Sequence, residues 1–133
     1  MSKILFICWG NVARSQMAEA YYNHFTHTKN ASSAGTLDFT PEKYKIPLKP
    51  VIEVMKEEGI DISQQKVEFV TQEMVDTNDK IYILCKKEKC PEFLLNSNKI
   101  EIWDIKDPFG ESHEVFRKTR EIIKNKIEEI TTH

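Results

Sequence analysis

Short apolar runs alternate along the chain with stretches in which apolar residues recur every three or four positions. The runs at 4–7 and 81–84 are apolar at every position, and 100–103 is rich in β-branched and aromatic residues. Strands that are apolar throughout are typical of a parallel sheet covered on both faces. A weaker strand is expected to end at 32–35. This alternation predicts an α/β fold in which right-handed crossovers join parallel strands.

Amphipathic stretches between the strands predict the helices that would cover such a sheet. Apolar stripes run through 17–25 and 48–55, and a third follows one side of a long helix expected over 112–130. The segment 37–50 contains three prolines and is expected to be a long surface loop.

Length and charge limit what the protein can be. A chain of 133 residues suggests a single domain over 1–133. Nineteen Lys and Arg against 21 Asp and Glu give a net charge of −2, so no bulk positive field favours a nucleic-acid or membrane partner. No apolar run approaches the roughly 20 residues of a membrane span, and the first residues lack the features of a signal peptide. We expect a cytoplasmic monomer.

The chain has three cysteines, Cys8, Cys85 and Cys90. An odd number in a chain of cytoplasmic character does not make a structural disulfide framework. Each cysteine therefore has to be interpreted separately.

Cys8 stands where the first predicted strand ends, and Arg14 follows six residues later at the start of a helix. Such a loop directs backbone N–H groups and a positive dipole end into its bowl, which favours a nucleophilic thiolate and an anionic ligand. Arg14 adds a planar fork that matches tetrahedral oxyanions, and the Ser15 hydroxyl is close enough in sequence to donate to Cys8. The alternative is an inert buried cysteine near a solvated arginine. The predicted oxyanion-binding residues are Trp9, Gly10, Asn11, Val12, Ala13, Arg14 and Ser15.

This motif, Cys8-x5-Arg14-Ser15 followed by Gln-Met-Ala-Glu, resembles the low-molecular-weight protein tyrosine phosphatase superfamily. That superfamily includes the thioredoxin-coupled arsenate reductases. The resemblance continues through 33–35, 59–63 and 107–108. It implies a three-layer fold in which helices flank a four-stranded parallel sheet.

Asp107 lies in the loop after the last predicted strand, before a proline. Loops after parallel strands gather at the carboxyl edge of the sheet, so Asp107 can reach the bowl opened by Cys8. A leaving oxygen needs a proton, which a carboxylic acid can supply. The sequence alone leaves an Asp-Pro turn without chemistry equally open. The resemblance favours Asp107 as the general acid, with Asp104 as the second candidate.

Cys85 ends a predicted strand at the same edge as Cys8, and Cys90 follows five residues later. Three lysines lie between these two cysteines and are expected to favour thiolate character in both. The resemblance to arsenate reductases implies a relay. Cys8 attacks arsenate, Cys85 attacks Cys8 and releases arsenite, and Cys90 then carries the disulfide to thioredoxin or a similar dithiol. Residues five apart in a regular helix are about 7.5 Å apart along its axis, too far for a disulfide. The segment 86–92 is therefore expected to be irregular or to unwind on oxidation.

Two alternatives to an arsenate reductase stay open. One is a low-molecular-weight protein tyrosine phosphatase that hydrolyses phosphomonoesters through a Cys8 phosphocysteine. Against it, Asp107-Pro108 is followed by one aromatic, Phe109, and then a glycine, where such phosphatases usually have tyrosines. The other is a non-enzymatic oxyanion-binding redox sensor. In that sensor the thiols themselves would be the redox-active groups. The alternative to a relay role is a buried strand-end thiol for Cys85 and an incidental loop thiol for Cys90.

The resemblance also implies a potassium ion beneath the loop, held by oxygen atoms of Asn11, Glu19, Ser33 and Asp61. The alternative for Glu19 is a solvated helix residue. No other cofactor is expected.

Overall fold

Four parallel strands form one sheet in the order β2-β1-β3-β4 in the computed structural model, which describes residues 2–38 and 40–132. β1 (Ile4–Cys8) pairs with β2 (Ala31–Gly35) on one side and with β3 (Lys80–Ile83) on the other. β4 (Ile100–Ile102) pairs with β3 and forms an edge. The predicted α/β class and the four-stranded parallel sheet are confirmed.

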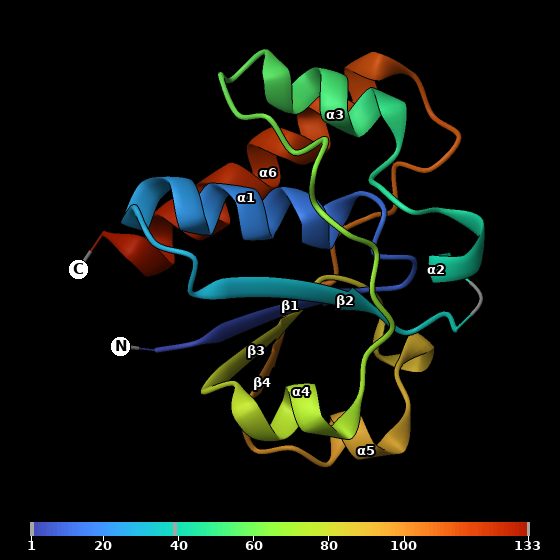
Figure 1. Ribbon diagram of the computed structural model, residues 1–133, viewed down its shortest axis with the longest axis vertical. Helices are drawn as coiled ribbons and strands as arrows, with labels where there is room; N and C mark the ends of the chain where they lie inside the picture. Colours follow the sequence, from blue (N-terminus) through green and yellow to red (C-terminus); the bar gives the residue numbers. More distant parts are fainter. Residues whose placement is uncertain (1, 39, 133) are drawn as a thin grey trace.

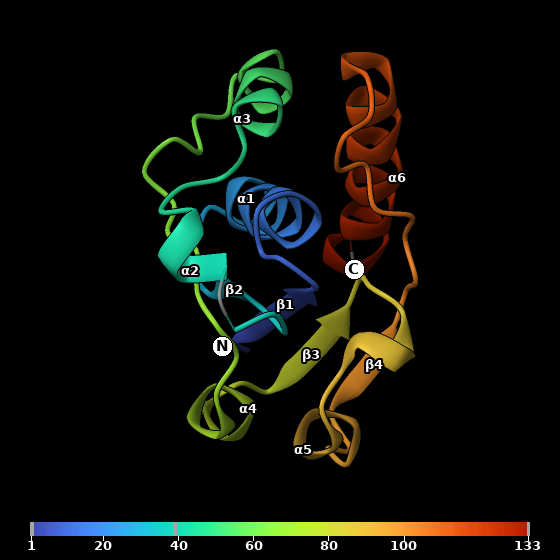
Figure 2. The ribbon, with the colours of Figure 1, turned by 90° about the vertical axis from the view of Figure 1, so that its right-hand side faces the viewer.

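Helices cover both faces of this sheet and complete three layers (Figures 1 and 2). One face carries α1 (Arg14–Thr26), α3 (Lys49–Lys56) and α6 (His113–Thr131). The other carries two shorter helices, α4 (Gln72–Thr77) and α5 (Glu92–Leu95). The three amphipathic stretches of the sequence correspond to α1, α3 and α6. None of the helices within the described ranges is long and apolar enough to cross a membrane.

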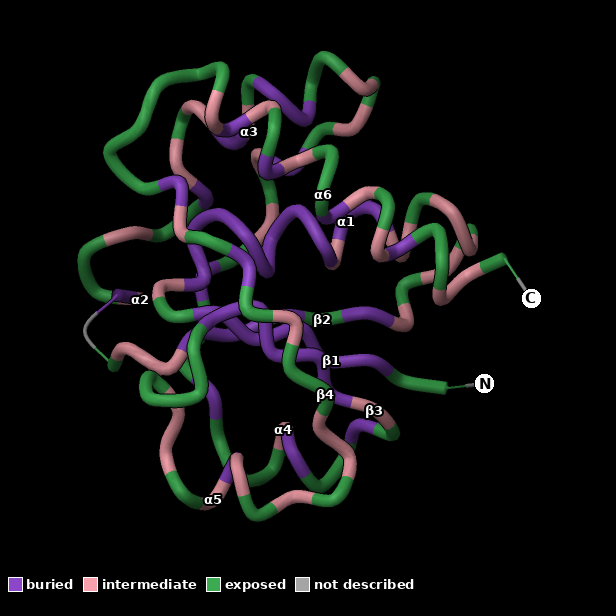
Figure 3. The backbone as a smooth tube through the Cα atoms, turned by 180° about the vertical axis from the view of Figure 1, so that it is seen from behind, coloured by how far each residue is buried: buried purple, intermediate pink, exposed green. Residues whose placement is uncertain are grey.

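The central strand is buried along its whole length, as its apolar sequence predicts. All five residues of β1 are buried, and Phe6 and Ile7 have no exposed surface. In the tube of Figure 3 the buried colour follows β1 and continues into α1. β4 is different, because Glu101 and Ile102 are exposed at the edge of the sheet. Because β1 is buried on both faces, it holds the start of the loop that follows it in a fixed position.

The segment 37–50 is more structured than the sequence suggested. It contains α2 (Thr40–Lys43), and Thr40 is buried. Further along, the Leu48 N–H donates to the carbonyl of Val12 at 3.1 Å. The expectation of a long surface loop is wrong over this stretch, because the segment packs against the loop that follows β1.

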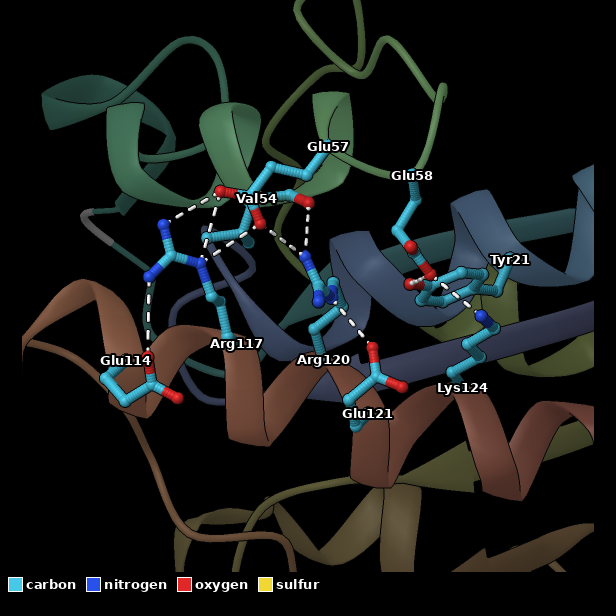
Figure 4. A network of polar contacts seen from close by, with 9 residues as sticks. All are labelled: Tyr21, Val54, Glu57, Glu58, Glu114, Arg117, Arg120, Glu121 and Lys124. Carbon is cyan, nitrogen blue, oxygen red and sulfur yellow. Dashed lines mark hydrogen bonds and ion pairs between the residues drawn. The ribbon is translucent and has the colours of Figure 1, made fainter.

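The docking of α6 uses an ionic network that lies outside the core (Figure 4). Arg117 and Arg120 both donate to Glu57, at the end of α3, with contacts of 2.7–3.1 Å. These hydrogen bonds lower the pKa of Glu57 to about 2. Lys124 donates in the same way to Glu58 at 2.9 Å. These contacts fix the long helix against the end of α3. The Ser112 side chain caps the start of α6 by accepting a hydrogen bond from the Val115 N–H.

Candidate active site

The loop of residues 8–15, here the oxyanion loop, joins β1 to α1 at the carboxyl edge of the sheet (Figure 1). Cys8 is buried, and its sulfur accepts a hydrogen bond from the Asn11 N–H at 3.2 Å. The Ser15 hydroxyl lies 2.9 Å from the same sulfur. Because Ser15 Oγ already accepts from the Asn11 amide at 2.7 Å, its hydrogen is free to point at Cys8. Two donors therefore converge on the sulfur.

Asn11 gives the loop its shape. Its backbone is left-handed, with φ of 55°, a conformation that asparagine tolerates better than most residues. The side chain donates to Ser15 and to Ser33, and its oxygen accepts from Gln16 and from the Glu68 N–H. Asn11 itself is fully buried, and these contacts tie the loop to α1, to β2 and to the segment before Val70.

Gly35 supports the same loop from the neighbouring strand, opposite Cys8 in the register of β1 and β2. A Cβ atom at Gly35 would lie 2.8 Å from the Trp9 carbonyl oxygen and 3.0 Å from the Asn11 nitrogen. A Cβ at Gly10 would meet only ordinary contacts, at 3.5 Å or more. The close approach of backbone to backbone therefore requires glycine at Gly35, a role that the sequence did not assign.

Arg14 is buried and held by the carboxyl ends of β3 and β4. Its Nη1 donates to the carbonyls of Leu84 at 3.1 Å and Ile105 at 2.7 Å, which uses both hydrogens of that group. Nη2 lies 3.5 Å from Oδ2 of Asp107. The edge formed by Nε and Nη2 is the part of the guanidinium left for an anion.

Asp107 shares a cavity with Cys8, whereas Asp104 does not. Asp107 lines the same cavity as Cys8, pairs with Arg14, and accepts a hydrogen bond from the Phe109 N–H at 3.0 Å. Asp104 lines only a neighbouring cavity. The geometry therefore favours Asp107 over Asp104 as a proton donor.

The cavity above Cys8, here the first cavity, has a volume of about 200 Å³. Trp9, Gly10, Val12, Ala13 and Arg14 line it, whereas Asn11 and Ser15 lie beneath and hold the sulfur. The sequence missed the remaining wall, since no motif marks it and it comes from the segment around α2. Those residues are Leu37, Thr40, Lys43 and Tyr44, with Phe109 opposite.

Cys85 and Cys90 form a thiol pair at the end of β3. Between them Lys86 is extended, 87–89 form one 3-10 turn, and Cys90 is extended again, so the chain is irregular here as predicted. The turn brings the two thiols close enough for each to shift the pKa of the other, and the Cys90 thiol donates to the Lys86 carbonyl at 3.8 Å. Cys85 is buried and Cys90 is partly exposed.

The neighbouring Cys85 thiol lowers the pKa of Cys90, while the Cys90 thiol and burial raise the pKa of Cys85. The predicted thiolate character is therefore wrong for Cys85. For Cys90 the direction is correct, but the cause is the neighbouring thiol rather than the lysines.

A second cavity of about 600 Å³ adjoins the first, and Cys85 lines it. Three side chains line both cavities: Trp9, Arg14 and Asp107. The structure thus brings Cys8, Arg14, Asp107 and the thiol pair to one edge of the sheet. The three shared side chains form a wall between the cavity that Cys8 lines and the cavity that Cys85 lines.

Three of the four residues expected to hold a potassium ion beneath the loop are linked by hydrogen bonds. Asn11 donates to Ser33 at 2.9 Å, and Ser33 donates to Glu19 at 2.7 Å. Burial raises the pKa of Glu19, which is therefore not a solvated helix residue. Asp61 is exposed and accepts from the Ser63 N–H, and it takes no part in these hydrogen bonds.

A strand-end cysteine, an arginine at the following helix start and an acid from the last loop define a class of phosphatase-like enzymes. The chain belongs to the low molecular weight phosphotyrosine protein phosphatase family, whose sequence model matches residues 3–133. It is 35% identical over 131 residues to arsenate reductase 2 of Staphylococcus epidermidis, covering 97% of this chain and 95% of that protein. Arsenate reductase of Staphylococcus aureus (strain Newman) is 35% identical over 128 residues, covering 94% and 92%. These relatives indicate that the protein is an enzyme.

Solved structures agree with the sequence relatives. An arsenate reductase in its phosphate-binding state superimposes with a TM-score of 0.83 at 30% identity, covering 99% of this chain and 98% of that one. A low molecular weight protein tyrosine phosphatase from T. tengcongensis gives a TM-score of 0.81 at 28% identity, covering 98% and 97%. Both enzyme types of the family therefore share this fold.

Proposed function

We propose that the protein is an arsenate reductase that uses Cys8 as nucleophile and the Cys85–Cys90 pair as the source of electrons. The observation that carries the proposal is the pair of neighbouring thiols at the two ends of one 3-10 turn, with Cys85 lining a cavity that Trp9 and Arg14 of the oxyanion loop also line. Hydrolysis of a phosphoenzyme needs no second or third thiol, whereas a reduction needs two electrons. The curated relatives named arsenate reductase support the same function.

In the first step the Cys8 thiolate attacks arsenic, and a sulfur–arsenic bond replaces an arsenic–oxygen bond. The Asn11 N–H and the Ser15 hydroxyl are placed to donate to the sulfur. The free edge of Arg14 binds the remaining oxygens, and Asp107 protonates the oxygen that leaves as water. Arsenic is still pentavalent after this step.

In the second step Cys85 attacks the sulfur of Cys8. A sulfur–sulfur bond forms, and the electron pair of the broken sulfur–arsenic bond stays on arsenic, which leaves as arsenite. Cys90 lies next to Cys85, and its lowered pKa favours the thiolate, which is the form that can accept the Cys85 proton as Cys85 attacks.

In the third step Cys90 attacks Cys85, which frees Cys8 and leaves a Cys85–Cys90 disulfide. Cys90 is the partly exposed member of the pair. A dithiol protein such as thioredoxin then reduces the disulfide by thiol exchange and is itself oxidised.

Two assays test this sequence of steps. Arsenate-dependent NADPH oxidation with thioredoxin and thioredoxin reductase should require Cys8, Cys85 and Cys90. Hydrolysis of p-nitrophenyl phosphate should require Cys8 and survive Cys90→Ser. Mass spectrometry after turnover with arsenate should find the Cys85–Cys90 disulfide. Equal loss of both activities in Cys90→Ser, or absence of that disulfide, would contradict the relay.

Phosphatase activity is a second candidate because the lining of the first cavity is largely apolar. Trp9, Leu37, Tyr44 and Phe109 contribute to it. An aryl phosphate could place its ring there while its phosphate occupies the oxyanion loop. Both activities use the same first displacement, and an aryl phosphatase without arsenate turnover would favour this second candidate.

A potassium ion beneath the loop stays part of the proposal. Ser33, Glu19 and Asn11 supply the hard oxygen ligands that such a cation prefers, and a cation would offset the cost of a buried Glu19 carboxylate. Asp61 does not join them. If the ion binds there, K⁺ should raise the melting temperature more than Na⁺ does, and Glu19→Gln should remove the difference.

A further inference from the structure

The wall between the two cavities separates the sulfur of Cys8 from that of Cys85. Cys8 lines only the first cavity and Cys85 only the second, among the described residues. The attack of Cys85 on Cys8 has to cross this wall. Its composition therefore decides how readily the two sulfurs meet.

Two members of the wall are fixed by several contacts. Arg14 is buried and donates to two backbone carbonyls. Asp107 contacts Arg14 and accepts from the Phe109 N–H. Moving either side chain would break hydrogen bonds or an ion pair that the first step also uses.

Trp9 is the member of the wall that can move. Its backbone is anchored, since its carbonyl accepts from the N–H groups of Thr36 at 2.9 Å and Leu37 at 3.0 Å. Trp9 is nevertheless 36% exposed. The indole can therefore rotate without disturbing the oxyanion loop.

Lys89 is the contact that holds the indole. Its Nζ lies 4.5 Å from the centre of the Trp9 ring, within the range of a cation–π interaction. Lys89 belongs to the 3-10 turn between Cys85 and Cys90, directly before Cys90. A rearrangement that carries Cys90 away from Cys85 therefore also moves Lys89 relative to the indole.

We propose that Trp9 is a gate between the oxyanion loop and the Cys85–Cys90 pair, and that Lys89 holds this gate closed. Trp9 is thus a positioning residue: it keeps Cys85 from Cys8 until the relay segment 85–90 moves. The biological role of the gate rests on the proposed reductase function. Its physical basis, the barrier between two sulfurs, can be measured without arsenate.

The test uses diamide as oxidant in a Cys90→Ser background, where Cys8 and Cys85 are the only cysteines left. Diamide takes up the two thiol hydrogens and two electrons as the Cys8–Cys85 bond forms. Acid-quenched samples are analysed by mass spectrometry. Lys89→Met should accelerate bond formation about two- to fivefold, the effect of losing one cation–π contact. Trp9→Ala should accelerate it further.

Lys87→Met is the matched control, since it removes the same charge from the same turn without a contact to Trp9. Neither Lys87 nor Lys89 lines the first cavity, so both variants should keep the kcat of their background for p-nitrophenyl phosphate; Lys89 lines the second cavity, so loss of its charge is expected to act on KM alone. A second readout uses Trp103→Phe, which leaves Trp9 as the sole tryptophan. Acrylamide should quench Trp9 more strongly in Lys89→Met than in Lys87→Met.

Equal oxidation rates in all three variants would overturn the gate. Acceleration in Trp9→Ala but not in Lys89→Met would overturn the role of Lys89. If Trp9→Ala does not fold, Lys89→Met and the quenching measurement decide alone. The rates of oxidation by diamide could follow the expected order while turnover with arsenate forms no Cys85–Cys90 disulfide. That result would refute the proposed function and leave the gate standing.

Discussion

Replacing Asn11 by alanine should damage both the stability of the protein and its first chemical step. The side chain makes four hydrogen bonds, three buried ones with Ser15, Ser33 and Gln16 and a part-buried one with the Glu68 N–H, at 2.7–3.2 Å. Each such bond contributes about 0.5–1.5 kcal/mol net, so their loss costs roughly 2–6 kcal/mol. This is a large part of the roughly 5–15 kcal/mol that stabilises a typical protein.

The left-handed backbone adds a separate cost. At a φ of 55°, alanine is less favourable than glycine by roughly 1–2 kcal/mol. Asn11→Gly removes the same hydrogen bonds without this strain. The difference in unfolding free energy between Asn11→Ala and Asn11→Gly therefore measures the backbone contribution alone.

Urea unfolding and p-nitrophenyl phosphate kinetics measure the two effects. Both variants should lower kcat/KM, because the Asn11 N–H and the Ser15 hydroxyl lose their alignment toward Cys8. Asn23→Ala is a useful control, since Asn23 also bonds to the backbone of β2, at Ala31, but far from the site. It should lower stability and leave kcat/KM unchanged. A loss below about 1 kcal/mol in Asn11→Ala, with kcat/KM within twofold, would refute this account of the loop.

Three further predictions follow from the same contacts. Gly35→Ala should destabilise the protein by about 1–3 kcal/mol in urea unfolding, because the new methyl group meets the Trp9 carbonyl oxygen at 2.8 Å; a neutral effect would contradict the tight packing. Asp107→Asn should lower kcat for phenyl phosphate about 100-fold or more, while inhibition by phosphate persists; an unchanged kcat would exclude Asp107 as the acid. Glu57 has a pKa of about 2 against 4.5 for the free side chain, so its contribution to stability is complete above pH 4.5 and is lost as the pH falls toward 2. The urea midpoint should fall over that interval, and less so in Glu57→Gln; equal pH profiles would contradict the role of the ion pairs.

The strand-end positions of the site could be predicted because they depend on local pattern. An apolar strand followed by Cys8-x5-Arg14 places the cysteine at a carboxyl edge, and the topology of parallel strands then brings Cys85 and Asp107 to the same edge. The irregular segment after Cys85 could also be predicted, because the Cys85–Cys90 disulfide that the family resemblance implies excludes a regular helix there.

Contacts between distant segments could not be predicted. The need for glycine at Gly35 arises only because the register of β1 and β2 sets it beside Cys8 and under the Trp9 carbonyl. The role of α2 in lining the first cavity depends on how the chain folds back over Val12. The prediction of thiolate character is wrong for Cys85 because the neighbouring Cys90 thiol and burial raise its pKa, and neither effect is visible in the lysines that follow it in the sequence.

The net charge of −2 conceals where the positive charge of this protein lies. The second cavity is lined by Arg14 and three lysines against two aspartates, and one of these, Asp107, already pairs with Arg14. Many carboxylates lie elsewhere, and Glu57 and Glu58 are bound to the cations of α6 (Figure 4). A dianionic oxyanion is attracted by the local field within about one Debye length, ~8 Å at physiological salt, rather than by the overall charge. The pairing of acids with the cations of α6 therefore leaves the field at the sheet edge positive, and a near-neutral chain can still bind arsenate or phosphate.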